Sequence, residues 1–383
     1  MLPNPFILID GTKITSIEQW ERWRKEIKEL VLELEYGTMP GVPEDARSEI
    51  VETQETEGYL SMQKLKYIFI PIRSRPEISF GLEVTIRFPD PKTVERVKQK
   101  IPTFGVGGLP CVIYVGMNPC IELLENGYII INYQNDQLEP IEEGNPIIGP
   151  ARTAYQLVEP DNYTWGSISV WAWGAIRMVD YALSISSVNK DQIIITGHSR
   201  NGKTALLAGA LDERIAIVNP AGSGCAGAGS FLALDEGCED IAALTDKRRW
   251  WTWMLPDFAH YGYNENKLFF DQHFLMGLVA PRPLLRTEGI LDEWANPRGT
   301  VVAYLATEEI YKFHGVPERN QLALRAGGHT QNREDMLALL SISNWHFFGV
   351  QQERIFKDLV CEPDKLPPFM DWKCPYIKSC GSR

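Results

Sequence analysis

The chain has 383 residues, 44% of them hydrophobic, and a formal net charge of −12 at pH 7. This length and composition suffice for a full α/β core, and α/β folds of this size are often one domain. The acidic charge repels phosphates, so it argues against nucleic acid or an anionic membrane as a partner and leaves the substrate class open.

The cysteines and the N-terminus exclude further classes. Seven cysteines, an odd number without a C-x-x-C pair, fit neither a disulfide framework nor a zinc site, and we predict no metal ion. Residues 1–6 show no basic segment before an apolar core, and no run approaches membrane-spanning length. As the sequence stands we expect a cytoplasmic protein; the alternative is secretion with the signal removed.

The N-terminal part of the chain predicts a helix followed by strands. Residues 16–36 have helical spacing with interleaved acidic and basic side chains, and Gly37 is a natural stop. Four strands are expected next, at residues 64–72, 82–88, 111–115 and 128–133. The last two are apolar throughout, as buried strands are.

The most informative segment surrounds Ser199. A helical pattern over residues 171–183 leads to a β-branched strand at 192–196, which breaks at Gly197 and continues from the serine into an Ala- and Leu-rich helix. So sharp a strand-to-helix turn presents the serine hydroxyl and aims the first N–H groups of the helix at an anion. The segment predicts the nucleophile of covalent acyl transfer, although the second glycine of G-x-S-x-G comes one position late, at Gly202. The alternative is a plain strand–helix connection in which the serine caps the helix.

A long insertion follows the nucleophile segment. Residues 215–218 and 283–285 are predicted strands, and residues 221–266 between them are rich first in glycine and then in tryptophan. Long irregular insertions on a rigid sheet usually build the binding face. Three tryptophans lie close together in it, at Trp250, Trp251 and Trp253. Core packing and substrate stacking explain them equally well.

A serine nucleophile needs a base and an acid, which follow it in the order Ser, Asp/Glu, His in this kind of fold. Asp292 lies in the turn beyond the strand candidate 283–285 and is the predicted acid, with Glu293 as the fallback. His329 follows the strand candidate 321–325 and two glycines, which let the loop bend toward the serine. We predict that this histidine is the base.

The other five histidines are interpreted as packing or surface residues, because a lone histidine is more often a hydrogen-bonded packing residue than a catalyst. His198 flanks the nucleophile and is expected to pack. His273 begins a helix and is expected to anchor it. His260, His314 and His346 have no supporting motif.

Motifs over almost the whole chain resemble those of the glucuronoyl esterases, with a closer likeness to the bacterial members. That family consists of α/β-hydrolases that cleave esters between lignin alcohols and the glucuronate side chains of xylan. The motifs are LPNPF (2–6), DGT (10–12), EYGT (35–38), WAWG (171–174), GHSRNGK (197–203), FDQH (270–273), APRP (280–283) and WANPRG (294–299). The segment with arginine directly after the serine and lysine four positions after it is the most specific.

The resemblance implies an α/β-hydrolase three-layer sandwich with a mostly parallel central sheet, in a single catalytic domain over residues 1–383. We expect a helical extension at about residues 1–45, the binding-face insertion at about 221–266, and a proline-rich tail at about 351–383.

The resemblance also implies roles for three further residues. Arg200 would add a cationic donor to the oxyanion hole, a kind of contact worth roughly 3 kcal/mol in the transition state. Lys203 would contact the sugar, and Trp294 would stack near it. The sequence pattern alone favours a solvated helix residue for Lys203 and a lid of the core for Trp294.

The chain departs from the family pattern in three places. Residues 219–224 contain no carboxylate where fungal members have a glutamate, so the resemblance implies Asp292 as the acid, as in bacterial relatives. His198 and Asn332 stand where fungal members have a cysteine pair, and that disulfide is absent. Residues 231–233 are Phe-Leu-Ala where bacterial relatives often have arginines, which weakens the case for a uronate.

We therefore predict a serine carboxylesterase with a Ser-His-Asp triad that acts on a carbohydrate ester and requires no cofactor. The expected substrate is a 4-O-methyl-glucuronoyl ester of a lignin–carbohydrate linkage or a glucuronate methyl ester, carried by a glucuronoxylan fragment or similar glycan. One alternative is an acetyl xylan esterase or other carbohydrate deacetylase. The other is a non-catalytic carbohydrate-binding relative that kept the fold.

Overall fold

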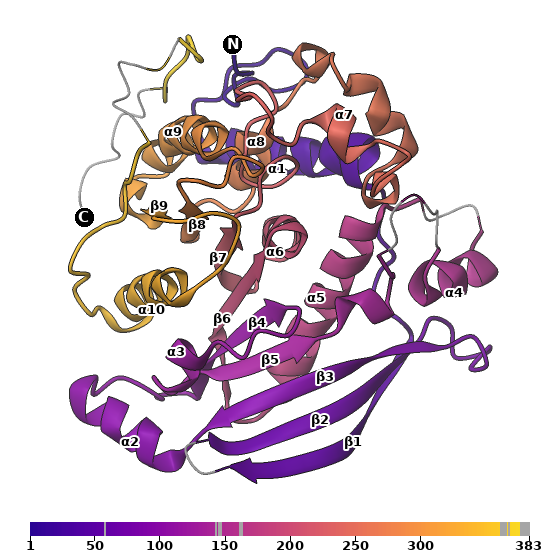
Figure 1. Cartoon of the computed structure of the whole chain (residues 1–383), viewed down its shortest axis with the longest axis vertical. Coiled ribbons are helices and arrows are strands. Elements are labelled where there is room, and N and C mark those ends of the chain that lie inside the picture. Colours follow the sequence, from indigo (N-terminus) through magenta and orange to yellow (C-terminus); the bar gives the residue numbers. More distant parts are fainter. Residues whose placement is uncertain are drawn as a thin grey trace.

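The computed structural model describes residues 1–56, 59–141, 144, 148–160, 164–360, 366 and 368–375. In this part of the chain nine strands form one sheet in the order β1-β2-β3-β5-β4-β6-β7-β8-β9 (Figure 1). They are β1 Asp45–Thr56, β2 Tyr59–Ile70, β3 Phe80–Pro89, β4 Leu109–Val115, β5 Ile129–Tyr133, β6 Val188–His198, β7 Ile215–Ala221, β8 Leu284–Gly289 and β9 Asn320–Arg325. The pairs from β1 to β5 along the sheet are antiparallel, and those from β5 to β9 are parallel.

Helices cover both faces of the sheet. They are α1 Ile17–Val31, α2 Pro91–Lys100, α3 Ile121–Leu124, α4 Pro150–Val158, α5 Ser167–Ser184, α6 Arg200–Leu211, α7 Ile241–Leu244, α8 Gln272–Gly277, α9 Pro297–Phe313 and α10 Arg333–Phe348. Alternate residues of β6 face opposite sides: Ile193 and Ile195 pack with the core under α5 and α6, and Ile194 packs with the core under α3 and α10. Two apolar cores on one buried sheet confirm the predicted three-layer α/β-hydrolase architecture.

The predicted N-terminal helix is α1 followed by a short π-helix, Leu32–Tyr36. Its indoles at Trp20 and Trp23 are fully buried and stacked at 4.1 Å, and Trp23 also packs on Phe274 of α8. The helix ends at Gly37, whose φ of 88° and close approach to the Thr164 carbonyl exclude a side chain. The segment therefore belongs to the main hydrophobic core of the molecule.

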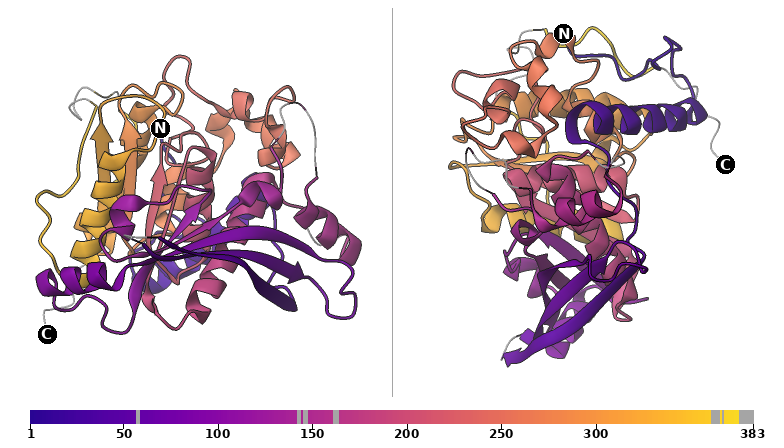
Figure 2. Two further views of the ribbon diagram at one scale, coloured as in Figure 1. Left: turned by 60° about the horizontal axis from the view of Figure 1, so that its bottom comes forward. Right: turned by 90° about the vertical axis from the view of Figure 1, so that its right-hand side faces the viewer.

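Strand β1 was not predicted. Its side chains are mostly exposed, and it pairs with β2 at the edge of the sheet from Asp45 opposite Ile70 to Thr56 opposite Tyr59. Figure 2 shows this antiparallel part of the sheet, in purple, extending from the end of the molecule opposite the N-terminus. A strand that buries few side chains carries no alternating hydrophobic signal, so β1 could not be expected from the residue pattern. The other eight strands lie at predicted positions with shifted ends.

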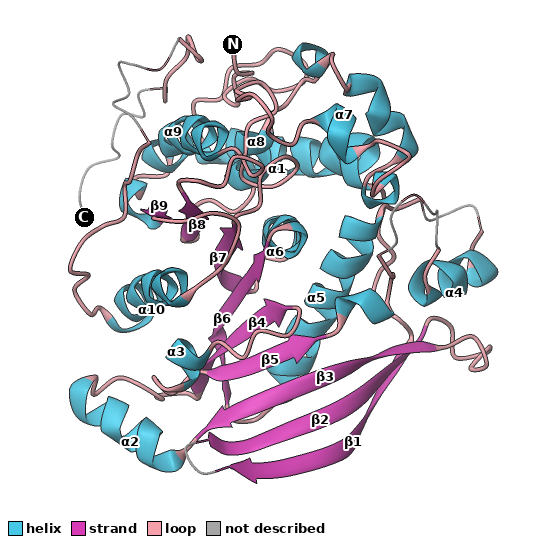
Figure 3. Ribbon diagram, viewed as in Figure 1, coloured by secondary structure: helices cyan, strands magenta, loops and turns pink. Residues whose placement is uncertain are grey.

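The segment between β7 and β8 consists mostly of long loops joined by short helices (Figure 3). Besides α7 and α8 it contains three 3₁₀-helices, Trp251–Trp253, Pro256–Tyr261 and Glu265–Lys267. In the described ranges no helix is both long and apolar enough to span a membrane. Of the predicted tail, residues 361–365, 367 and 376–383 lie outside the described residues.

Candidate active site

The turn between β6 and α6 places Ser199 at the carboxyl end of the parallel strands. The serine has φ 60° and ψ −126°, a strained backbone conformation, and its N–H donates to the Ala221 carbonyl of β7 at 3.0 Å. Its carbonyl accepts from Gly202 at 2.8 Å and Lys203 at 3.1 Å. A Cβ at Gly202 would lie 2.7 Å from the Ala221 carbonyl oxygen. The late glycine thus serves the turn by letting the helix approach β7.

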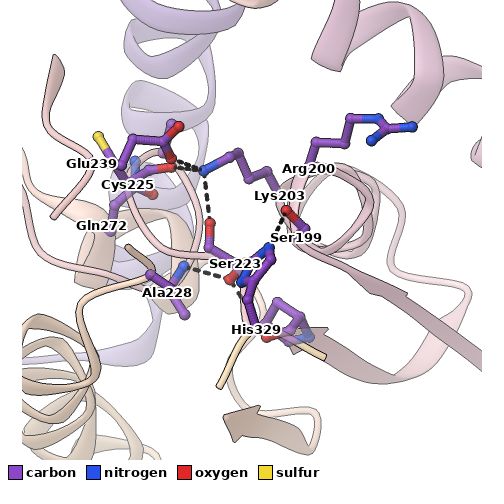
Figure 4. A network of polar contacts seen from close by, with 12 residues as sticks. Ser199, Arg200, Lys203, Ser223, Cys225, Ala228, Glu239, Gln272 and His329 are labelled. Atoms are coloured by element: carbon purple, nitrogen blue, oxygen red, sulfur yellow. Dashed lines mark hydrogen bonds and ion pairs between the residues drawn. The ribbon is translucent and has the colours of Figure 1, made fainter. Parts of the chain in front are cut away.

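Ser199, His329 and Asp292 form a hydrogen-bonded triad with the histidine in the middle. The serine Oγ lies 2.8 Å from His329 Nε2 (Figure 4). On the other side of the ring, His329 Nδ1 lies 2.7 Å from Asp292 Oδ2. A carboxylate at Nδ1 holds the proton there and leaves Nε2 to accept from the serine hydroxyl. Asp292 is buried and Glu293 is exposed, so Asp292 is the carboxylate in contact with the histidine.

A buried arginine fixes the loop that carries His329. Arg325, the last residue of β9, donates through Nε to Asp335 of α10 at 2.8 Å and through Nη1 to the Ala326 carbonyl at 3.0 Å. Its Nη2 donates to the Thr330 carbonyl beyond the histidine. The guanidinium therefore joins both ends of the loop, and this clamp was not anticipated from the sequence.

His198 packs against His329, and its packing role was expected from the sequence. Its ring centre lies 4.6 Å from that of His329, and burial, followed by the charge of His329, lowers the pKa of His198 to about 4. His273 is buried, donates through Nε2–H to the Pro3 carbonyl at 2.9 Å, and stacks on Trp372, so it ties α8 to the N-terminal segment. His314 and His346 are partly buried, and His260 is exposed.

Arg200 is the first residue of α6 and lines the pocket beside Ser199. Its backbone N–H is among those that begin the helix and have no carbonyl partner within it. The guanidinium lies 3.9 Å from Asp136, and burial lowers the pKa of Arg200. Its Nε is buried without a hydrogen-bond partner in the described part of the chain. A role of this side chain in the oxyanion hole stays a prediction.

Lys203 lies on the pocket floor and is almost fully buried, so the interpretation as a solvated helix residue is wrong. Its Nζ donates to the Ser223 carbonyl at 2.8 Å, to the Cys225 carbonyl, and to Glu239 Oε2 at 2.6 Å (Figure 4). All three ammonium protons have acceptors within the protein. A contact with the sugar, implied by the resemblance, stays a prediction, and Glu239 is a pocket residue that the sequence analysis missed.

The remaining wall of the pocket is aromatic. Trp253 is buried and packs at 6.1 Å from Trp171, and Trp250 stacks on it at 4.9 Å with an angle of 11° between the rings. Both indoles also line the pocket, so the same tryptophans pack against the core and face the space open to a ligand. Trp294 is half-buried in the same wall, and Arg249 lies between it and Trp250. This arginine was not anticipated from the sequence.

The pocket formed by these groups has a volume of about 370 Å³, within the range of small-molecule sites. Ser199 and His329 line it together with the aromatic wall and the Lys203–Glu239 pair. A nucleophile, a base held in one tautomer, and helix N–H groups beside a cavity can transfer an acyl group. In the described ranges no group of three or more His, Cys, Asp or Glu side chains is placed to hold a metal ion.

Known proteins resemble this chain over most of its length. The family "Glucuronyl esterase, fungi" matches residues 84–315, more than half of the chain. A carbohydrate esterase of an unknown prokaryotic organism is 27% identical over 401 aligned positions, covering 91% of this chain and 90% of the relative. A 4-O-methyl-glucuronoyl methylesterase of Phanerochaete carnosa is 29% identical, with 86% and 76% covered. The solved structure of a carbohydrate esterase family 15 glucuronoyl esterase from Caldicellulosiruptor kristjansonii superposes with a TM-score of 0.78 at 26% identity and 95% coverage of both chains.

Proposed function

The chain belongs to the glucuronyl esterase family, and we propose that it is a serine esterase that hydrolyses 4-O-methyl-glucuronoyl esters through Ser199, His329 and Asp292. The observation that carries the proposal is the continuous contact from Ser199 Oγ through His329 to Asp292 at the rim of a pocket large enough for a sugar. The methylesterase of Phanerochaete carnosa is named for this chemistry and supports the substrate class.

The reaction begins when Ser199 Oγ attacks the acyl carbon of the ester. His329 Nε2, at 2.8 Å, accepts the serine proton and becomes an imidazolium, which the buried Asp292 stabilises through Nδ1. Negative charge then develops on the acyl oxygen. The first N–H groups of α6 and the Arg200 side chain stabilise that charge.

His329 next returns the proton to the leaving alcohol, which departs and leaves the uronoyl group esterified to Ser199. A water molecule then enters and is deprotonated by the same histidine. Its attack releases the free uronate and regenerates the serine. A lignin alcohol on a glucuronoxylan fragment fits this scheme, because the alcohol need only reach the pocket rim.

The test is the hydrolysis of benzyl glucuronate and of p-nitrophenyl acetate by the wild type and by Ser199→Ala. We expect benzyl glucuronate to be preferred and the variant to lose activity by about 10⁴-fold or more. Cleavage of only the acetate, together with release of acetate from acetylated xylan, would instead indicate a carbohydrate deacetylase with the same triad. Sugar binding without cleavage of either ester would indicate a non-catalytic relative.

A further inference from the structure

The pocket holds a guanidinium that the proposed mechanism does not use. The Arg249 Cζ lies 4.6 Å from the ring centre of Trp250 and 4.4 Å from that of Trp294. Trp250 is itself stacked on Trp253. Contacts on the faces of a guanidinium leave its N–H donors, which lie in its plane, available at the edge. The aromatic wall therefore holds the arginine in place without using its hydrogen-bond donors.

The carboxylates in the part of the chain that the structure describes leave Arg249 without an ion pair. In the ranges that the structure describes, no acidic side chain lies within ion-pair distance of it. The nearby carboxylates have other partners: Asp246 pairs with Arg248 at 2.7 Å, and Glu239 pairs with Lys203 at 2.6 Å. An unpaired cation in a partly desolvated wall gains most from an anion that enters the pocket.

The charge balance of the pocket supports this conclusion. Its lining includes three cationic side chains, Arg200, Lys203 and Arg249, and one carboxylate, Glu239. The whole chain, by contrast, has a net charge of −12. The pocket is thus a positive site on an acidic protein, and it attracts anionic ligands.

A glucuronoyl ester does not account for that positive charge. Its carboxyl group is esterified and neutral, and the one negative charge of the transition state forms beside Ser199 and Arg200. Lys203 is already neutralised by Glu239. Arg249 therefore lacks an ion-pair partner among the described residues and in the minimal substrate. A planar guanidinium with free edge donors matches the geometry of a carboxylate.

We propose that Arg249 is a specificity-determining residue that binds a free carboxylate of the substrate, separate from the esterified one. This inference rests on the proposed function, since the bond that is cleaved is still the glucuronoyl ester. The free carboxylate has two sources with the same chemistry. One is a second, unesterified uronate in an acidic oligosaccharide, and the other is a carboxyl group on the leaving alcohol.

The experiment compares three esters. Benzyl glucuronate has no free carboxylate, 4-carboxybenzyl glucuronate has one on the alcohol, and the mono-benzyl ester of a diuronide has one on the sugar. The readout is the ratio of kcat/KM for each anionic ester to kcat/KM for benzyl glucuronate. We measure it for the wild type, Arg249→Met, Arg249→Lys and the matched control Lys247→Met.

We expect the wild type to prefer one of the two anionic esters, and that ester identifies the source. Arg249→Met should lower its ratio about tenfold or more, the effect of losing a charge-assisted hydrogen bond. Arg249→Lys keeps the positive charge but loses the planar guanidinium, so its ratio should lie between those of the wild type and Arg249→Met. Lys247 is in the same turn but is exposed and lies outside the pocket, so Lys247→Met should keep the ratio.

Salt provides a second readout, which in the wild type requires no substitution. Rising ionic strength should lower the ratio of the wild type and leave that of Arg249→Met unchanged. Equal ratios in the wild type, Arg249→Met and Arg249→Lys would overturn the inference while benzyl glucuronate hydrolysis continued. Failure of the wild type to cleave benzyl glucuronate would contradict the proposed function itself, so the two failures are distinguishable.

Discussion

The Ser199–His329–Asp292 triad and the aromatic wall of the pocket are positioned by different kinds of interaction. Ser199, Asp292 and His329 each follow the end of a parallel strand, and backbone features fix them: the strained serine turn and the loop clamped by a buried arginine. The wall depends on stacked side chains from distant parts of the sequence. Arg249 lies between the indoles of Trp250 and Trp294, which are 44 positions apart. We propose that the first region carries out the chemistry and that the second selects the substrate.

The largest effect on kcat in this comparison should come from changing Asp292, the carboxylate that contacts His329. Asp292→Asn should lower kcat by about 10³- to 10⁴-fold, because an amide no longer holds the His329 proton on Nδ1. Glu293→Gln is the matched control, since this carboxylate is exposed and adjacent. Steady-state kinetics on benzyl glucuronate tests both. Equal losses of kcat in the two variants would contradict the assignment of Asp292 as the acid that orients His329.

The buried ion pair under the pocket links the two regions, and breaking it should cost stability. Lys203→Met leaves Glu239 buried without its partner and should lower the free energy of unfolding by about 3–5 kcal/mol. The double variant Lys203→Met/Glu239→Gln removes the stranded charge and should recover part of the loss. Urea unfolding measures both. A single variant as stable as the wild type would contradict the buried pairing.

Two buried carboxyl groups, one near each region, should make stability depend on pH. Burial raises the pKa of Glu35, near the Lys203 floor, and of Glu288, near Asp292, to about 8 from an ordinary 4.5. The folded state therefore binds more protons than the unfolded state between these values, and its stability falls as the pH rises toward 8. Burial lowers the pKa of His198 to about 4 from 6.5, so its effect is the opposite: stability falls as the pH drops below 6.5.

Above pH 6.5 only the carboxyl groups of this set contribute, and we expect a decline of about 1–2 kcal/mol for each of them up to pH 8. Glu35→Gln and Glu288→Gln should each flatten the decline. Denaturant unfolding at a series of pH values measures the decline in the wild type and in both variants. Unchanged slopes in both variants would contradict these protonation states.

The smallest effect should come from the wall itself. Trp294→Ala removes one face of the stack around Arg249 and should raise KM by up to about tenfold with a smaller change in kcat. Trp251→Ala is the control, because this indole belongs to the same insertion but is not among the residues that line the pocket. An equal rise in KM for both variants would mean that the stack does not contact substrate.

We could single out Ser199, Asp292 and His329 from the sequence because each lies in a local pattern, and the structure brings the three into contact. A β-branched strand that breaks at Gly197, a carboxylate in the turn beyond a strand, and a histidine after two glycines are each visible within about ten residues. Strand β1 was missed because it buries few side chains and is held by backbone pairing at the sheet edge. Its charged sequence has no period that distinguishes it from a loop.

The pocket wall and floor could not be predicted in the same way. Lys203 looked exposed because a charged residue in a helix usually is, and its partner Glu239 lies in an irregular segment 36 positions away. Arg249 showed no motif, and its position depends on packing against Trp294 beyond the next strand. Contacts between irregular segments leave no periodic signal in a single sequence.

The central claim is that Ser199 is the nucleophile of an ester hydrolase, and covalent labelling tests it most directly. An organophosphonate that reacts with activated serines is added to the wild type and to Ser199→Ala, and peptide mass spectrometry locates the label while benzyl glucuronate hydrolysis is followed. We expect one label per chain, on Ser199, with activity lost in proportion to labelling and no labelling of the variant. Activity that survives full labelling of Ser199, or a label on another serine that abolishes activity, would contradict the claim.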